Sequence, residues 1–236
     1  VNGIAIVGAP DDSWAGWHVS TAGDVDGDGL SDLLISAPFA GSPDNAGETY
    51  LVFGSHLNSM KQSGSGFLDL SALDGTSGML IRGVEEDGKS GWTAEAAGDI
   101  NLDGLGDIFI SVPYSGPVGR SDAGSVEVIF GSFLTEAKNS GTASFDIGTG
   151  PNPGRGVVIY GTTADFETGE DTSWIGDFNG DGKPDLLLGA EDANPGGVSN
   201  AGSSYLISGH TIDLAADGIG VADAGLIDLL TDFNLG

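Results

Sequence analysis

Short apolar segments, separated by turns rich in Gly, Asp, Asn, Ser and Pro, recur along the whole chain. They fall into three matching sets: 4–8, 79–83 and 157–161; 33–38, 108–113 and 186–191; and 46–54, 123–131 and 201–209. Each segment has the length and composition of a β-strand, and no helical periodicity extends beyond a turn or two. The pattern therefore predicts an all-β chain made of a repeated group of strands.

The spacing of these segments divides the chain into three units, 3–77, 78–155 and 156–236, each with about four strands. Short strands grouped in fours are typical of propeller blades, whereas many solenoids have one strand per repeat. A tandem array of immunoglobulin-like domains is the competing interpretation, but each such domain needs about 100 residues. We therefore predict β-propeller-type blades of four antiparallel strands, which together form one propeller or part of one.

An acidic nine-residue segment occurs once in every unit, directly before an apolar run. Its pattern is Asp-x-[Asp/Asn]-x-Asp-Gly-x-x-Asp, at 24–32, 99–107 and 177–185. Calcium takes six to eight oxygen ligands at about 2.3 to 2.6 Å. Side chains at positions 1, 3, 5 and 9 and the main-chain carbonyl of position 7 can surround such an ion, while glycine at position 6 permits the sharp turn. The segments therefore predict three calcium-binding loops.

The predicted ligands follow from these positions. In the first loop they are the side chains of Asp24, Asp26, Asp28 and Asp32 with the carbonyl of Leu30; in the second, Asp99, Asn101, Asp103 and Asp107 with Leu105; and in the third, Asp177, Asn179, Asp181 and Asp185 with Lys183. Four carboxylates close together in the first loop would repel one another strongly without an ion. We therefore expect calcium binding to be coupled to folding.

Two alternatives to these calcium loops are an EF-hand and a loop that holds another divalent ion. An EF-hand begins with the same residues, but it requires a bidentate glutamate at position 12 and flanking helices. Position 12 is Ile35, Ile110 or Leu188 here, so the EF-hand does not fit. Magnesium or manganese can enter such loops in vitro, but the number of ligands favours the larger ion.

The order of these motifs resembles the FG-GAP repeat of integrin α-subunit β-propellers. The resemblance rests on Gly16-Trp17, the acidic loop, the strand 33–38 and the segment 47–54, and all three units share it. The third unit departs from the pattern, with Glu170 in place of the tryptophan, and Glu191 and Ser208 in place of the usual Pro and Phe. The resemblance implies blades of four antiparallel strands, with the ion in the hairpin between the first two strands.

Composition narrows the range of partners. The chain has 35 acidic and 7 basic residues, a formal net charge of −28, and no cysteine. Nucleic acid and anionic membranes would be repelled, and three divalent ions would bring the charge only from −28 to −22. No apolar stretch approaches 18 residues and no basic leader is present, so we expect no membrane insertion and expect targeting information to lie outside this sequence. These features favour a secreted, extracellular or cell-surface protein in which bound cations replace disulfides.

Few other residues suggest chemistry. The three histidines, His18, His56 and His210, share no metal-site or triad spacing. Trp17 and Trp92 occupy equivalent places and are expected to pack between units. Trp14 and Trp174 break the repeat, which makes them the better candidates for a unit-specific role such as stacking on sugars.

Two functions remain open from the sequence. The first is a non-enzymatic adhesion or recognition module that binds an extracellular protein or glycan through the insertions 40–45, 114–122 and 192–200. The second is a scaffold or carbohydrate-binding part of a secreted hydrolase or lyase, with the catalytic domain elsewhere. Closed propellers have four to eight blades. More repeats in the same parent chain, or a second copy, are therefore expected to close the ring.

Overall fold

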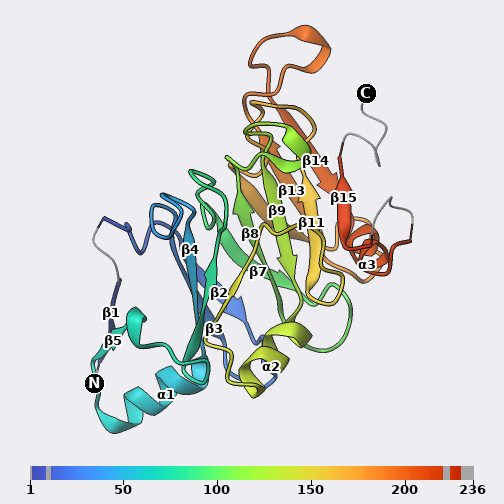
Figure 1. Ribbon diagram of the computed structural model, residues 1–236. Coiled ribbons are helices and arrows are strands. Elements are labelled where there is room, and N and C mark those ends of the chain that lie inside the picture. Colours follow the sequence, from blue (N-terminus) through green and yellow to red (C-terminus); the bar gives the residue numbers. More distant parts are fainter. Residues whose placement is uncertain (1, 9–11, 220–223, 230–236) are drawn as a thin grey trace.

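The computed structural model describes residues 2–8, 12–219 and 224–229 and is mostly strand with few helices (Figure 1). Its sheets follow one another along the molecule, with β1 and β5 at one end and β13 and β14 towards the other. The described strands do not close into a ring. The end of the predicted third unit, 230–236, lies outside the described residues.

The first sheet has the strand order β10-β6-β4-β3-β2. Four of its strands are antiparallel neighbours, and the fifth, β10, runs parallel to β6. The strands are β2 (Val19–Gly23), β3 (Asp32–Ala37), β4 (Glu48–Val52), β6 (Gly78–Arg82) and β10 (Ser144–Asp146).

The second sheet repeats this arrangement in the order β15-β11-β9-β8-β7, with β15 parallel to β11. Its strands are β7 (Ala94–Gly98), β8 (Asp107–Val112), β9 (Ser125–Ile129), β11 (Gly156–Tyr160) and β15 (Leu226–Asp228). The prediction of four antiparallel strands therefore omitted a fifth, parallel strand. Each five-stranded sheet combines three strands of one sequence unit with two of the next.

The remaining strands form two smaller sheets at the ends of this series. β12 (Thr172–Gly176), β13 (Asp185–Ala190) and β14 (Ser203–Ile207) make an antiparallel three-stranded sheet. β1 (Ala5–Val7) and β5 (Phe67–Asp69) make a parallel pair equivalent to β6–β10 and β11–β15. When the sequence units are compared, the three-stranded sheet is equivalent to the first three strands of a five-stranded sheet, and the β1–β5 pair is equivalent to its last two.

Three α-helices contradict the prediction of a chain without helices. They are α1 (Gly54–Ser63), α2 (Gly131–Asn139) and α3 (Gly209–Ala216), which follow β4, β9 and β14 along the chain. Short 3-10 turns lie at Leu70–Ala72, Pro117–Gly119 and Pro195–Gly197. The α-helices bury only two or three residues each, such as Leu134 and Ala137 in α2. A stripe this short gives a weak periodic signal, so tertiary packing decides their conformation.

The hydrophobic core lies between successive sheets. Leu34 and Leu51 of the first sheet share a cluster with Ile108 and Ile110 of the second. The opposite face of the second sheet, with Phe109, packs against the three-stranded sheet in another cluster. Because each sheet buries one face against the next, the acidic loops are held in a fixed series at one end of the strands.

Candidate metal sites

Each acidic loop joins the first two strands of its sheet in chain order. The loops connect β2 to β3, β7 to β8 and β12 to β13, which confirms the predicted hairpin position. The strand register shifts just before each loop, and glycine turns the chain there with positive φ at Gly23, Gly98 and Gly176. The glycines at position 6, Gly29, Gly104 and Gly182, have φ of 85, 88 and 90°, as that sharp turn requires.

The aspartate at position 1 organises each loop by accepting main-chain hydrogen bonds. Oδ1 of Asp24 accepts from the N–H groups of Gly27 at 2.8 Å and Asp28 at 3.1 Å, and its Oδ2 accepts from Gly29 at 2.9 Å. Asp177 repeats this arrangement, and Asp99 accepts from the equivalents of Asp28 and Gly29. The three loops therefore share one backbone shape that curls around the carboxylate.

The first loop brings three acidic side chains together. Asp24, Asp26 and Asp28 each offer one oxygen, and these oxygens all lie within 4.8 Å of one another. Three oxygens of hard, charged ligands at this separation suit a calcium ion, whose charge would remove their mutual repulsion. The residues fit the ion that the sequence predicts for this loop.

Asparagine replaces the second aspartate in the other two loops. Oδ1 of Asn101 accepts the N–H of Asp103 at 3.2 Å, and its Nδ2 donates to Oδ2 of Asp103 at 2.9 Å. Oδ1 of Asn179 accepts the N–H of Asp181 at 2.9 Å. An amide oxygen is also a calcium ligand, so these loops offer an oxygen in the same place with one negative charge fewer.

The aspartate at position 9 has a second role that the sequence did not predict. Oδ2 of Asp32 accepts the N–H of Val25 at 2.9 Å, and its Oδ1 accepts the N–H of Gly54, the first residue of α1, at 2.7 Å. Asp107 and Asp185 bond to the first residues of α2 and α3 in the same way. This buried carboxylate therefore joins the loop to the following helix.

Burial also perturbs two of these carboxyls. It raises the pKa of Asp32 to about 6 and that of Asp107 to about 7, partly opposed by the main-chain hydrogen bonds just described. The charges of Asp26 and Asp28 raise the pKa of Asp32 further. Asp32 lies outside the group of three mutually close carboxylates. Its direct ligation of an ion, like that of Asp107 and Asp185, stays a prediction.

The loops of neighbouring units contact one another. The N–H of Gly106 donates to the carbonyl of Asp24 at 2.8 Å. The side chain of Lys183, whose carbonyl is the predicted ligand at position 7, donates to the carbonyl of Ile100 at 2.7 Å and lies 3.1 Å from Oδ2 of Asp213. Leu30 and Leu105 occupy position 7 of the first and second loops. Ligation of an ion by their carbonyls, and by that of Lys183, also stays a prediction.

One cation contacts the first loop from the next unit. Nζ of Lys138 in α2 forms an ion pair with Oδ2 of Asp26 and lies 4.2 Å from the centre of the Phe53 ring. Asp26 and Lys138 are 112 residues apart, so local spacing could not predict this contact. A divalent cation in the loop and this lysine would both be attracted electrostatically to the Asp26 carboxylate.

An aromatic cluster lies at the opposite end of the strands from the loops. We define it as Trp14, Trp17, Phe39, Trp92 and Tyr114, whose neighbouring ring centres are 4.7 to 6.4 Å apart. The contact between Trp17 and Trp92, at 4.7 Å, joins two units and confirms the predicted packing. Trp14 remains 60% exposed. Nζ of Lys89 lies 3.8 Å from the centre of the Tyr114 ring.

The third unit carries carboxylates where the first two carry this cluster. Glu167 and Glu170 take the places of Trp14 and Trp17, and Asp192 takes that of Phe39. Burial, followed by repulsion from neighbouring carboxylates, raises the pKa of Glu167, and burial likewise raises that of Glu170. The hydroxyl of Tyr114 donates to Oε1 of Glu170 at 3.2 Å. This end of the molecule therefore changes from aromatic to acidic along the series.

The other residues singled out in the sequence have structural surroundings. Trp174 is partly buried and packs against the core cluster between the last two sheets. Nδ1 of His18 is 3.1 Å from the carbonyl of Ala94, and Nε2 of His18 is 3.5 Å from Glu95. Neither contact indicates catalysis. No helix in the described part of the chain is long and apolar enough to cross a membrane.

Comparison with known proteins identifies the repeat. The FG-GAP repeat model matches residues 15–52, 91–129 and 175–207. Phosphatidylinositol-glycan-specific phospholipase D of Bos taurus is 30% identical over 199 residues, which are 80% of this chain and 21% of the relative. Integrin alpha-PS2 of Drosophila melanogaster is 35% identical over 127 residues, 54% of this chain and 8% of the relative. The chain therefore spans about a fifth or less of these relatives.

Proposed function

We propose, on the premise that this chain carries three FG-GAP repeats homologous to integrin α subunits and to phosphatidylinositol-glycan-specific phospholipase D, that it is a calcium-binding module for extracellular recognition. Its sheets act as propeller blades, one calcium ion is held in each acidic loop, and the module itself is not an enzyme. It binds an extracellular protein or glycan at the end of the strands opposite the acidic loops, where the aromatic cluster lies.

The observation that carries the calcium assignment is the shared shape of the three loops. In each of them the first aspartate curls the backbone, position 6 is a glycine with positive φ, and the last aspartate is tied to a helix. A turn that was merely polar would not need the same set of hydrogen bonds three times. The grouped oxygens of Asp24, Asp26 and Asp28 give the first loop the strongest support.

Ion counting and thermal unfolding test this proposal. Chelated protein titrated with calcium in a calorimeter is expected to bind three ions, and calcium at about 100 times the dissociation constant adds about 2.7 kcal/mol per site to the stability. The Asp28→Asn variant should weaken one site. Glu86→Gln is the control, because it removes the same charge from an exposed residue outside the loops. A chelated parent protein without a calcium site would refute the assignment.

The aromatic cluster supports recognition at the other end of the strands. It is partly exposed, it borders the insertions at 40–45 and 114–122, and carboxylates lie beside it in the third unit. Aromatic faces next to hydrogen-bonding groups are common in binding sites because they combine contact area with polar anchors. A Trp14→Ala variant should lose a ligand captured by the parent protein while keeping its calcium binding.

A second candidate function is a carbohydrate-binding or scaffold part of a secreted hydrolase or lyase. The exposed face of Trp14 beside Trp17 and Phe39 favours it, since sugars stack on such faces, and one set of relatives is named as a phospholipase. A glycan array and a panel of hydrolase substrates separate the two functions. Turnover that is lost on changing an acidic pair outside the loops would favour the enzyme.

A further inference from the structure

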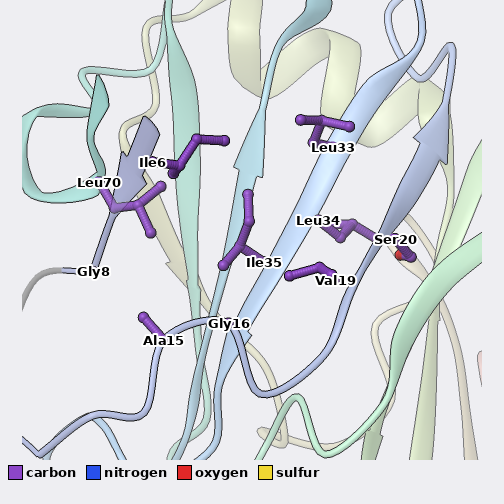
Figure 2. A pocket seen from close by; sticks show the side chains of 10 residues that line it. All are labelled: Ile6, Gly8, Ala15, Gly16, Val19, Ser20, Leu33, Leu34, Ile35 and Leu70. Carbon is purple, nitrogen blue, oxygen red and sulfur yellow. The ribbon is translucent and has the colours of Figure 1, made fainter. Parts of the chain in front are cut away.

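The hollow shown in Figure 2 offers little chemistry. It lies between β1 and the first sheet, has a volume of about 400 Å³ and is lined mainly by apolar side chains such as Ile6, Ile35 and Leu70. Ser20 supplies the one polar side chain among its described lining residues. A reactive pair of residues that the proposed function does not use lies instead in the third acidic loop.

Asn179 and Gly180 form an Asn-Gly pair at positions 3 and 4 of that loop, and both residues are exposed. Asn-Gly is prone to deamidation, because glycine has no Cβ to hinder the approach of its nitrogen to the asparagine side chain. The chain contains this pair at one other place, Asn2-Gly3, which is also exposed but lies outside the loops. Only the pair at Asn179 includes a predicted calcium ligand.

The backbone of the loop favours glycine after Asn179 but does not require it. Gly180 has a φ of 79°, in the left-handed region that glycine adopts easily. The equivalent residue of the second loop is Leu102, which has a φ of 58°. A Cβ on Gly180 would meet no atom within 4 Å. The pair Asn101-Leu102 therefore has the same amide at the same loop position without the reactive neighbour.

The closed form of the third loop holds both of the groups that would react. The N–H of Gly180 donates to Oδ1 of Asp177 at 2.6 Å, and Oδ1 of Asn179 accepts the N–H of Asp181 at 2.9 Å. Deamidation requires the Gly180 nitrogen to leave Asp177 and attack Cγ of Asn179. Because Asp177, Asn179 and Asp181 are all predicted ligands, a bound ion would stabilise the closed form and make this opening rarer.

We propose that Asn179 is a deamidation site that calcium protects, an inference that rests on the calcium assignment of the third loop. In the open, ion-free loop the Gly180 nitrogen loses its proton to the solvent and forms a bond to Cγ of Asn179. The bond between Cγ and the amide nitrogen breaks and ammonia leaves, which gives a five-membered cyclic imide. Water then opens either of the two imide carbonyl groups and yields aspartate or isoaspartate at position 179.

The two products affect the loop differently. Aspartate gives the third loop the same side chain at position 3 that the first loop has in Asp26. Isoaspartate continues the chain through its side-chain carbon, which adds a methylene to the backbone between positions 3 and 4. The three main-chain hydrogen bonds that Asp177 accepts then cannot all form. Since isoaspartate is the usual main product of imide opening, loss of the ion leads to loss of the site.

Peptide mass spectrometry of the 236-residue chain, incubated at mildly alkaline pH with chelator or with calcium, tests the proposal. In chelator Asn179 should react faster than Asn101. Calcium at about 100 times the dissociation constant of the third site should slow the reaction about 100-fold, because only the ion-free fraction opens. Asn2 should react at the same rate in both conditions, which controls for direct effects of the ion. Gly180→Leu should lose the reaction at Asn179.

Calorimetry of the incubated proteins gives a second readout. Protein kept in chelator until Asn179 has reacted should bind one calcium ion fewer per chain than fresh protein. Gly180→Leu treated in the same way should lose none, since Leu102 shows that the loop accepts leucine at this position. Asn179→Asp should bind as many ions as the parent protein, which separates the inserted methylene from the added charge.

The outcomes distinguish this inference from the calcium assignment on which it rests. Suppose that Asp181→Asn removes one calcium site, so that the third loop binds the ion. Equal rates at Asn179 with and without calcium would then overturn the inference and leave the assignment intact. Reaction at Asn101 as fast as at Asn179, or reacted protein that keeps all its sites, would also overturn it. A chain in which calorimetry finds no calcium site would overturn both.

Discussion

Asp32 and Gly54 link the first acidic loop to helix α1, which follows strand β4. Oδ1 of Asp32 accepts the N–H of Gly54 at 2.7 Å, across 22 residues of sequence. Gly54 must approach closely, because a Cβ on it would lie 2.5 Å from the carbonyl oxygen of Ser31. In the Phe-Gly dipeptide of the repeat, phenylalanine stands directly before the helix without a side-chain capping bond, and glycine allows the contact with the aspartate.

This relationship predicts a specific cost for a methyl group at the helix start. Gly131 begins α2, and its Cβ would lie 2.5 Å from the carbonyl oxygen of Gly106 in the second loop. Gly131→Ala should destabilise the protein by about 1 to 3 kcal/mol, as overpacking does, measured by urea unfolding. Gly154→Ala has room for its Cβ and should change stability little. Equal losses in the two variants would contradict the explanation.

A buried ion pair in the second sheet should be costly to break. Nη2 of Arg155 and Oε2 of Glu127 are 3.0 Å apart, with both side chains almost fully buried. Arg155→Met should destabilise by about 3 to 5 kcal/mol because it leaves a buried charge without its partner. Adding Glu127→Gln should restore part of the loss.

The exposed pair of Arg82 and Asp146, whose side chains are 41 and 48% exposed, is the control for that experiment. Arg82→Met should cost less than about 1 kcal/mol, because water solvates the remaining charge. Chemical unfolding of both variants side by side gives the comparison. A larger loss at Arg82 than at Arg155 would show that burial does not set the cost.

Acid stability should depend on Asp74. Its Oδ1 accepts hydrogen bonds from the main-chain N–H and the hydroxyl of both Thr76 and Ser77, which lowers the pKa of Asp74 below its ordinary 3.8. A lowered pKa in the fold means that this group adds stability above about pH 4, and that the contribution is lost as the pH falls through the folded value.

Asp74→Asn keeps an oxygen acceptor at the same place but cannot titrate. The parent protein should therefore lose more stability than this variant between about pH 4 and pH 2, as followed by urea unfolding at each pH. Because every other carboxyl is common to both proteins, the difference between their curves isolates Asp74. Parallel curves would mean that its hydrogen bonds do not distinguish its two protonation states.

The aromatic contact between units should be measurable by a double-mutant cycle. The ring centres of Trp17 and Trp92 are 4.7 Å apart, and pairs of this kind add about 0.5 to 1.5 kcal/mol beyond the area that they bury. Trp17→Ala and Trp92→Ala should therefore cost less together than the sum of the two. Trp17→Ala combined with Phe133→Ala, which belongs to the pair with Phe145, should be additive.

The sequence alone determined the features that depend on local spacing. The repeated nonapeptide defined the loops and the glycines at which they turn, and the matching apolar segments located most of the strands. Such patterns are readable because a turn of nine residues and a strand of five or six are specified by neighbouring residues.

Only the tertiary structure decided the features that join distant segments. It brought Lys138 into an ion pair with Asp26 and added the parallel fifth strand to two sheets. It also joined the buried last aspartate of each loop to the first residue of a helix by a hydrogen bond. It also decided that Leu34 is buried whereas its equivalent Leu187 is exposed. The reason is physical: burial and close approach depend on which segment packs alongside, and the spacing of residues within one repeat carries no information about that neighbour.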